Sequence, residues 1–457
     1  MTTSRWRWHG WAATRPAADT TSRAHETKGT EMTDFSAQVF QNEFLAAGAT
    51  DVHAIVTVTC SGAGQAGQSG AGDAAEMIIV DTSGSMTGAA IQAARDAAIA
   101  ALYQILDGTW FAVVAGSHWA RLAYPIGTRE LAMARMSPST RSAAAYEISR
   151  LAPDGGTAMG TWLELAAAVF DSVPTAAQRH AILLTDGKNQ HESPQDLDRR
   201  IAAVAGRFQC DCRGVGAQWE VGEVRRIAHA LMGTVDLIPR PEQMAEEFAT
   251  LMRAAMSRGV AAADLRVWAP QGAQVLFVRQ VSPSVEDLTS RRREVNALTG
   301  AYPTGSWGDE SRDFHVAVRV AAARSVGQEQ LAARVQLAIG DEVRAQALVK
   351  ARWTDDDALS AKINPEVAHY TGQTELAEAI QDGLAAKAAG DDATATAKLG
   401  RAVQLAAETG NDEATSKLRK VVDIDTGTGK VRLRKQVDKL DEMALDTSST
   451  KTTRVRR

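Results

Sequence analysis

The chain has 457 residues, of which 45% are hydrophobic and 23% are charged, as in soluble globular proteins. Its 50 Lys and Arg residues against 55 Asp and Glu residues give a net charge of -5, which argues against a nucleic-acid-binding surface. No apolar run reaches the roughly 20 residues that a membrane-spanning helix needs, so neither nucleic acid nor membrane is expected as a partner. The length predicts two or three domains.

The first 31 residues and the cysteines bear on the compartment. Residues 1–31 contain Arg and Trp but no apolar core of a secretory signal, so we expect them to be disordered or to precede a true start at Met32. The cysteines, Cys60, Cys210 and Cys212, are odd in number and have no spaced framework. This favours a reducing compartment and hence a cytoplasmic location. Cys210 and Cys212 fall on a predicted strand and are expected to be core thiols.

Between residues 75 and 256, short apolar strands alternate with amphipathic helices. The strands are nearly continuous apolar runs, which is typical of a parallel sheet covered on both faces. They are MIIVD, WFAVVAG, ARLAYP, HAILLTD, CDCRGVG and TVDLI. The alternation predicts an α/β domain built on a doubly wound, mostly parallel, Rossmann-like sheet.

Two flanking segments predict a second, all-β domain. Residues 262–355 alternate apolar and polar side chains in strand-length runs separated by polar turns, as in a β-sandwich. Residues 35–60 show the same alternation but have no sheet of their own. We therefore predict that residues 35–60 join the β-sandwich and that the α/β domain is inserted between its two halves.

The C-terminal part is predicted to be helical. Residues 363–442 carry Ala and Leu at helical spacing, and the breaks AGDD and TGN suggest a helix hairpin of the tetratricopeptide-like kind. Residues 443–457 are polar and basic, and we expect a disordered tail there.

Oxygen-bearing side chains gather where predicted strands end or a helix starts. They are Asp81, Ser83, Ser85, Thr157 and Asp186. Each alone is more often a helix cap or a turn residue. Ligands of doubly wound sheets bind at the carboxyl ends of the strands, so all of them in this order favour one shared site.

These positions match Asp-x-Ser-x-Ser, then Thr, then Asp, the pattern of the metal-ion-dependent adhesion site (MIDAS). On these residues, the stretch 75–256 resembles the von Willebrand factor type A (VWA) family. The resemblance implies Mg²⁺ or Mn²⁺ as the cation, with Ser83 and Ser85 as direct ligands and the aspartates often acting through water. It also implies a coordination position left for an acidic side chain of a partner. Hydroxyl and carboxylate oxygens are hard donors, which suit Mg²⁺.

We predict a cytoplasmic bacterial protein that is not an enzyme: a scaffold or regulator that captures an acidic residue of a protein partner through the cation. The alternative is an accessory subunit of an ATPase-coupled complex similar to magnesium chelatase, with the nucleotide hydrolase supplied by a partner. A surface adhesin is a third hypothesis, and the missing signal sequence argues against it.

Two other motifs lack a residue that their chemistry requires. DIDTGTGKVRLRK has Ile424 where a phosphate-binding loop needs its first glycine, so we expect a turn between short strands or between helices. His191-Glu192 lacks the second histidine of a zinc-protease helix, and Ser193 is expected to cap a helix instead. His118 is expected to be an ordinary turn histidine.

The tail hydroxyls allow two interpretations. A solubilising tail is the first, and a kinase target is the second, because a phosphate adds nearly two negative charges that an Arg-bearing module could bind. The second predicts a Ser/Thr kinase and a phosphothreonine reader as partners. The residues concerned are Thr447, Ser448, Ser449, Thr450, Thr452 and Thr453.

Overall fold

The computed structural model describes residues 33–67, 73–127, 130–321, 326–425 and 430–455. The prediction for residues 1–31 lies outside the described residues, as do Gly427 and Gly429 of the DIDTGTGK motif. No helix within the described ranges combines the length and hydropathy needed to cross a membrane.

The α/β part is built on one mostly parallel sheet in the order β10-β9-β8-β4-β5-β6, with β7 paired to β5. Adjacent strands from β10 to β5 run parallel, and β6 and β7 run antiparallel to β5. This confirms the predicted doubly wound α/β fold. The strands are β4 (Asp73–Asp81), β5 (Trp110–Gly116), β6 (Ala120–Tyr124), β7 (Ala134–Arg135), β8 (Ala176–Thr185), β9 (Gln209–Val215) and β10 (Val235–Ile238).

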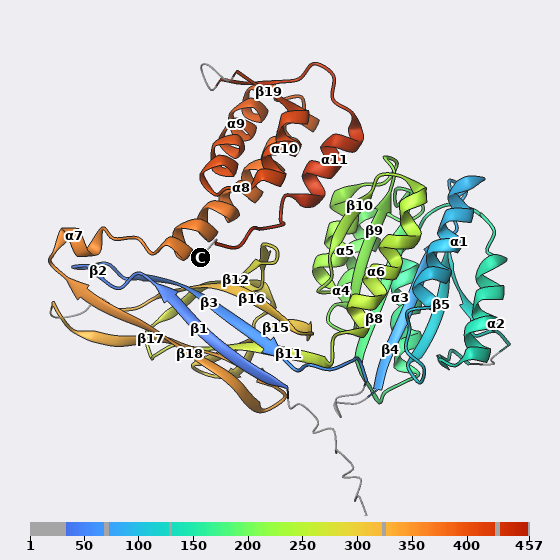
Figure 1. The fold of residues 1–457 in the computed structure, drawn as a ribbon, viewed down its shortest axis with the longest axis horizontal. Helices are drawn as coiled ribbons and strands as arrows, with labels where there is room; N and C mark the ends of the chain where they lie inside the picture. Colours follow the sequence, from blue (N-terminus) through green and yellow to red (C-terminus); the bar gives the residue numbers. More distant parts are fainter. Residues whose placement is uncertain (1–32, 68–72, 128–129, 322–325, 426–429, 456–457) are drawn as a thin grey trace, which may run out of the picture. The chain divides into compact units, whose positions relative to one another are not determined.

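Helices cover both faces of this sheet (Figure 1). Ile78 and Val80 of β4 share a buried cluster with helices α1 (Ala89–Leu102), α2 (Pro138–Ser149) and α6 (Met244–Met256). Met77 and Ile79 point the other way, toward α3 (Met159–Asp171), α4 (Pro194–Val204) and α5 (Val221–Ala230). Because successive side chains alternate between faces, a strand buried on both sides must be apolar throughout, as MIIV is.

Two sheets form the sandwich, and their strands pair antiparallel except for β2, which pairs in parallel with β18. One has the order β1-β3-β16-β12-β13 and the other β14-β15-β11-β17-β18-β2. Strand β3 lies before the α/β part in the chain but pairs along its length with β16, which lies after it. The bounds are β1 (Asp34–Gln41), β2 (Leu45–Ala46), β3 (Asp51–Ser61), β11 (Val260–Trp268), β12 (Gln274–Ser282), β13 (Glu286–Asp287), β14 (Arg293–Asn296), β15 (Thr299–Trp307), β16 (Glu310–Arg319), β17 (Glu329–Ile339) and β18 (Glu342–Thr354).

The helical part contains further helices and a strand pair in addition to one helix hairpin. After the short α7 (Asp357–Ser360) come α8 (Pro365–Ala388), α9 (Asp392–Glu408), α10 (Asp412–Val421), the antiparallel pair β19 (Val422–Ile424) and β20 (Val431–Leu433), and α11 (Lys439–Ser448). AGDD and TGN end α8 and α9 because Gly390 and Gly410 take positive φ, and Asp391 and Asn411 then cap the next helices.

The predicted disorder of residues 443–457 is wrong for the residues that the structure describes. Helix α11 continues to Ser448, and Thr447, Ser448 and Ser449 are buried. The composition was misleading because these hydroxyls are bonded to the protein. For example, Ser448 Oγ donates to the Ala444 carbonyl at 2.7 Å.

Residues 449–455, the C-terminal strap, pair with the turn between β12 and β13. The Val285 N–H donates to the Thr450 carbonyl at 2.7 Å, and the Thr452 N–H donates to the Pro283 carbonyl at 3.1 Å. The strap also reaches other elements: Lys451 forms an ion pair with Asp236 of β10, Gln373 of α8 donates to Thr453 Oγ1 at 3.0 Å, and Arg454 lies 3.3 Å from Asp313. The strap therefore ties the sandwich to the α/β and helical parts.

Deleting residues 449–457 is expected to lower the melting temperature and to expose α8 to protease, because each lost hydrogen bond contributes about 1 kcal/mol. Thermal unfolding and limited proteolysis would measure this. Deleting only residues 456–457 is the control. Equal melting temperatures and equal protease sensitivity of the two truncations would contradict a stabilising role of the C-terminal strap.

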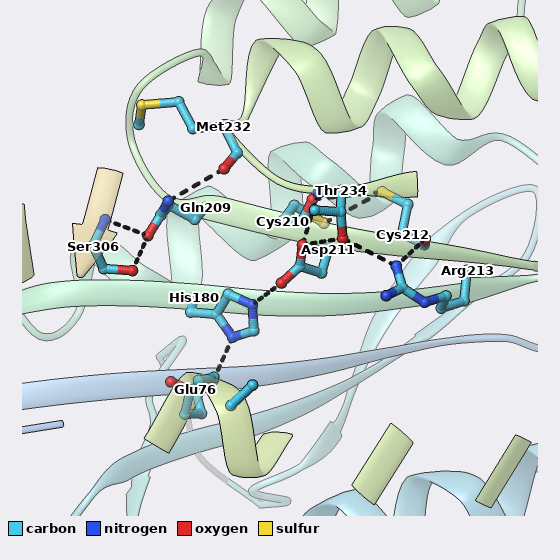
Figure 2. A network of polar contacts seen from close by, with 12 residues as sticks. Glu76, His180, Gln209, Cys210, Asp211, Cys212, Arg213, Met232, Thr234 and Ser306 are labelled. Carbon is cyan, nitrogen blue, oxygen red and sulfur yellow. Dashed lines mark hydrogen bonds and ion pairs between the residues drawn. The ribbon is translucent and has the colours of Figure 1, made fainter. Parts of the chain in front are cut away.

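A buried charged network crosses the sheet (Figure 2). His180 of β8 lies between Glu76 of β4 and Asp211 of β9, with Nδ1 2.7 Å from Glu76 Oε2 and Nε2 3.0 Å from Asp211 Oδ2. Asp211 Oδ1 also accepts from the N–H and hydroxyl of Thr234 at 2.7 and 2.6 Å. Burial alone would lower the pKa of His180, but the charge of Glu76 and the hydrogen bonds to both carboxylates raise that pKa to about 9. The imidazolium is thus the internal counter-ion of Asp211, whose pKa it lowers, whereas burial raises the pKa of Glu76 in spite of the imidazolium.

The raised pKa makes stability depend on pH. Below pH 6.5 the His180 proton contributes its full stabilisation, which is lost as the pH rises through about 9. We expect the free energy of unfolding to fall over that interval by on the order of 3 kcal/mol. Denaturant unfolding at several pH values would measure the slope.

His180→Gln is the matched variant. It is expected to be less stable at pH 7 by about 3–5 kcal/mol, because it removes the cation that contacts both buried acidic groups, and to lose the slope between pH 6.5 and 9. An unchanged slope in the variant would show that another group titrates.

Candidate metal centre

Three segments meet at the carboxyl edge of the sheet where β4 and β8 end. Asp81 is the last residue of β4, and Ser83 and Ser85 lie in the turn that leads to α1. Asp186 directly follows β8, which pairs in parallel with β4. The chain continues from β4 to β5 on one side and enters β8 on the other, so this edge is the topological switch point of the sheet.

The serines and aspartates form a hydrogen-bonded cluster. Ser85 Oγ donates to Asp186 Oδ1 at 2.6 Å, and the hydroxyls of Ser83 and Ser85 are 3.1 Å apart. Asp81 Oδ1 accepts from the Ser83 N–H at 2.8 Å, and Asp81 Oδ2 accepts from the Thr185 hydroxyl at 2.7 Å. The structure therefore brings four of the five predicted residues into one network.

Thr157 joins this cluster at Gly187. A methyl group placed on Gly187 would lie 3.2 Å from Thr157 Oγ1, 3.4 Å from Ser85 Oγ and 3.9 Å from Ser83 Oγ. Three hydroxyls from two distant segments therefore surround one small space that only a glycine leaves open.

Backbone hydrogen bonds hold the segments together. The Gly84 N–H donates to the Gly155 carbonyl at 2.8 Å, and the Asp154 N–H donates to the Thr82 carbonyl at 2.7 Å. The loop before α3 is thus fixed to the loop after β4 by two bonds, independently of the side chains of the cluster.

Residues that the sequence reasoning set aside or passed over support Thr157. Helix α3 begins after Ala158, which has no capping side chain, and the loop after β8 caps it instead. Asn189 Oδ1 accepts from the Met159 N–H at 2.8 Å, and Glu192 Oε1 accepts from the Gly160 N–H at 2.6 Å. The sequence carried one signal for this arrangement: Ala158, at the start of α3, has no side chain that could cap the helix. The expected cap of α4 by Ser193 is confirmed.

The set-aside histidines flank the same loop. His118 lies in the turn between β5 and β6, as expected, and its ring packs over Gly155. His191 packs over Gly156, and the two rings are 6.3 Å apart.

The electrostatics of the two carboxylates differ from those of surface residues. Burial raises the pKa of Asp81 to about 6, although hydrogen bonds from Ser83 and Thr185 act against it. Burial also raises the pKa of Asp186. A cation next to these groups would favour their ionised forms.

The donor set fits a hard divalent cation. Within the described part of the chain, no group of three or more His, Cys, Asp or Glu side chains could hold a metal, so hydroxyls would have to complete the coordination here. Two carboxylates and three hydroxyls are all oxygen donors, which Mg²⁺ prefers, and Mg²⁺ keeps several waters. The thiols do not contribute: Cys60, Cys210 and Cys212 are buried in the cores.

Gly187→Ala is expected to weaken Mg²⁺ binding by about tenfold or more, because the added methyl group would crowd the Thr157 and Ser85 hydroxyls. Isothermal titration calorimetry would measure the affinity. Gly222→Ala in α5, where a methyl group meets nothing within 4 Å, is the matched control. Equal Mg²⁺ affinities of the Gly187→Ala and Gly222→Ala variants would contradict a cation site next to Gly187.

Comparisons with known proteins identify relatives of this chain. The von Willebrand factor type A domain model matches residues 77–188, and the von Willebrand factor type A C-terminal domain model matches residues 404–449. The solved structure of von Willebrand factor type A from Catenulispora acidiphila is 47% identical, and the match covers 93% of this chain and 98% of that one with a TM-score of 0.87.

More distant relatives share less. The ArnB paralog VWA2 from Sulfolobus acidocaldarius is 14% identical over 92% of this chain and 98% of its own, with a TM-score of 0.53, and so shares the fold. The uncharacterized protein sll0103 of Synechocystis sp. is 28% identical over 217 residues, or 46% of this chain. Those residues are 49% of that relative, so the chain spans about half its length.

Proposed function

The chain belongs to the von Willebrand factor type A family, and from this premise we propose that it is a cation-dependent protein-binding module acting as a scaffold or regulator. Domains of this family are commonly metal-dependent protein-interaction modules. The proposed role is binding rather than catalysis.

The proposed cation is Mg²⁺ or Mn²⁺, held by Asp81, Ser83, Ser85, Thr157 and Asp186. The observation that carries the proposal is the convergence of three hydroxyls on the space above Gly187, with the carboxylates of Asp81 and Asp186 bonded to the same cluster. When bound, the cation would supply an electrophilic position for a carboxylate. Because the aspartates often act through water in the family, the ion would keep a coordination position for a third carboxylate.

The proposed partner offers an acidic side chain to that position. The rim of the site can be reached by another protein, since Ser85, His118 and His191 are exposed and the Trp119 side chain is 48% exposed. An exposed Trp is a typical anchor in protein interfaces.

The structure of the tail reduces the number of hydroxyls that a kinase could reach. The kinase hypothesis assumed accessible hydroxyls, but Thr447, Ser448 and Ser449 are buried. The half-buried Thr450, Thr452 and Thr453 are left as sites for a kinase and a phosphothreonine reader.

A pull-down from native cells, with and without EDTA, tests the function. Proteins that require the cation are expected to be lost with EDTA, to return with added Mg²⁺ or Mn²⁺, and to be lost with Asp81→Ala. Asp96→Ala removes an exposed carboxylate of α1 and is the matched control.

Partners retained in EDTA and by Asp81→Ala would contradict the proposal. Cation-dependent recovery of a nucleotide hydrolase would instead favour the ATPase-coupled alternative.

A further inference from the structure

The backbone before Thr157 is clasped between two imidazoles. A methyl group on Gly155 would lie 1.8 Å from His118 Nδ1, and one on Gly156 would lie 1.9 Å from His191 Nδ1. Both glycines are therefore required by the close approach of a ring, and the rings come from two different loops.

His191 makes two hydrogen bonds to Thr157. Its ring Nδ1 accepts from the backbone N–H of Thr157 at 3.2 Å. The backbone N–H of His191 donates to the Thr157 carbonyl at 2.9 Å. Both polar backbone groups of Thr157 are thus satisfied by one residue. Acceptance at Nδ1 requires the tautomer with its proton on Nε2.

The segment that carries His191 is itself anchored. The Asn189 N–H donates to Glu223 of α5 at 3.1 Å, and Glu192 forms an ion pair with Arg200 of α4 at 3.0 Å. The capping bonds from Asn189 and Glu192 hold the start of α3. His191 therefore connects Thr157 to a segment that is held in place by α4 and α5.

We infer that His191 is a positioning residue for the cation site: it fixes the backbone of Thr157 so that the hydroxyl faces the space above Gly187. This rests on the proposed function, because it assigns a support to one of the proposed ligands. The ring is not itself placed as a ligand, since its Nδ1 lone pair is directed at the Thr157 N–H. Groups that orient metal ligands typically change metal affinity by about 10–100-fold when removed.

The test is calorimetric titration of Mg²⁺ into the full chain, with the melting temperature of the metal-free protein measured in parallel. His191→Ala is expected to weaken Mg²⁺ binding by about tenfold. His191→Asn carries an acceptor at the same distance from the backbone and is expected to retain affinity within about threefold. His191→Gln, whose amide is one bond farther out, should resemble His191→Ala, and Gln190→Ala is the exposed neighbouring control.

A second variant tests whether Gly156 acts through His191. Gly156→Ala should displace the ring and cause the same loss of about tenfold, because its methyl group would overlap Nδ1. The double variant Gly156→Ala/His191→Ala should be no weaker than either single variant. A multiplied loss of about a hundredfold in the double variant would overturn the inference, because Gly156 would then act independently of the ring.

The remaining outcomes separate this inference from the proposed function. Equal Mg²⁺ affinity in the wild type and His191→Ala would overturn the positioning role alone. A loss in His191→Ala that His191→Asn does not rescue would also overturn it. Absence of Mg²⁺ and Mn²⁺ binding to the wild type would overturn the proposed function itself.

Discussion

The parallel pairing of β4 with β8 is the constraint on which the site depends. It places Asp81 and Asp186, more than a hundred positions apart in sequence, at one sheet edge, and the Thr185 hydroxyl links them by donating to Asp81. The chain leaves β4 toward β5 and enters β8 from the other side, so the loops diverge and leave space above the edge. The loop carrying Thr157 fills one side of that space and is fixed there by backbone bonds to the turn after β4.

The sheet holds two acidic pairs whose charges are balanced differently. Between Glu76 and Asp211 the protein supplies its own cation, the imidazolium of His180 (Figure 2). Asp81 and Asp186 have hydroxyl partners but no ion pair among the described residues, and burial raises the pKa of both. Carboxylates with an internal counter-ion do not need an external one, whereas an acidic pair without a counter-ion favours an external cation. The contrast gives a physical reason why one cluster is structural and the other is a candidate binding site.

Much of this could be predicted from the sequence, because local patterns determine it. The apolar runs of β4 and β8 and the oxygen donors at their ends identified the sheet and the five candidate residues. The support for Thr157 could not be predicted, because Asn189 and Glu192 cap a helix that starts 30 residues earlier, and only tertiary structure brings them together. The prediction of a disordered tail was wrong for a related reason. Thr452 and Arg454 are polar residues typical of a solvated tail, yet their partners are the Val281 carbonyl and the Asp313 carboxylate.

The central claim is that this sheet edge holds one divalent cation. Titration of Mn²⁺ followed by electron paramagnetic resonance counts bound ions directly, in the wild type and in the Ser83→Ala/Ser85→Ala variant. The account predicts one Mn²⁺ per chain in the wild type, displaced by Mg²⁺, and none in the variant over the same concentration range. Failure of the wild type to bind Mn²⁺ stoichiometrically, or equal uptake by the variant, would contradict it.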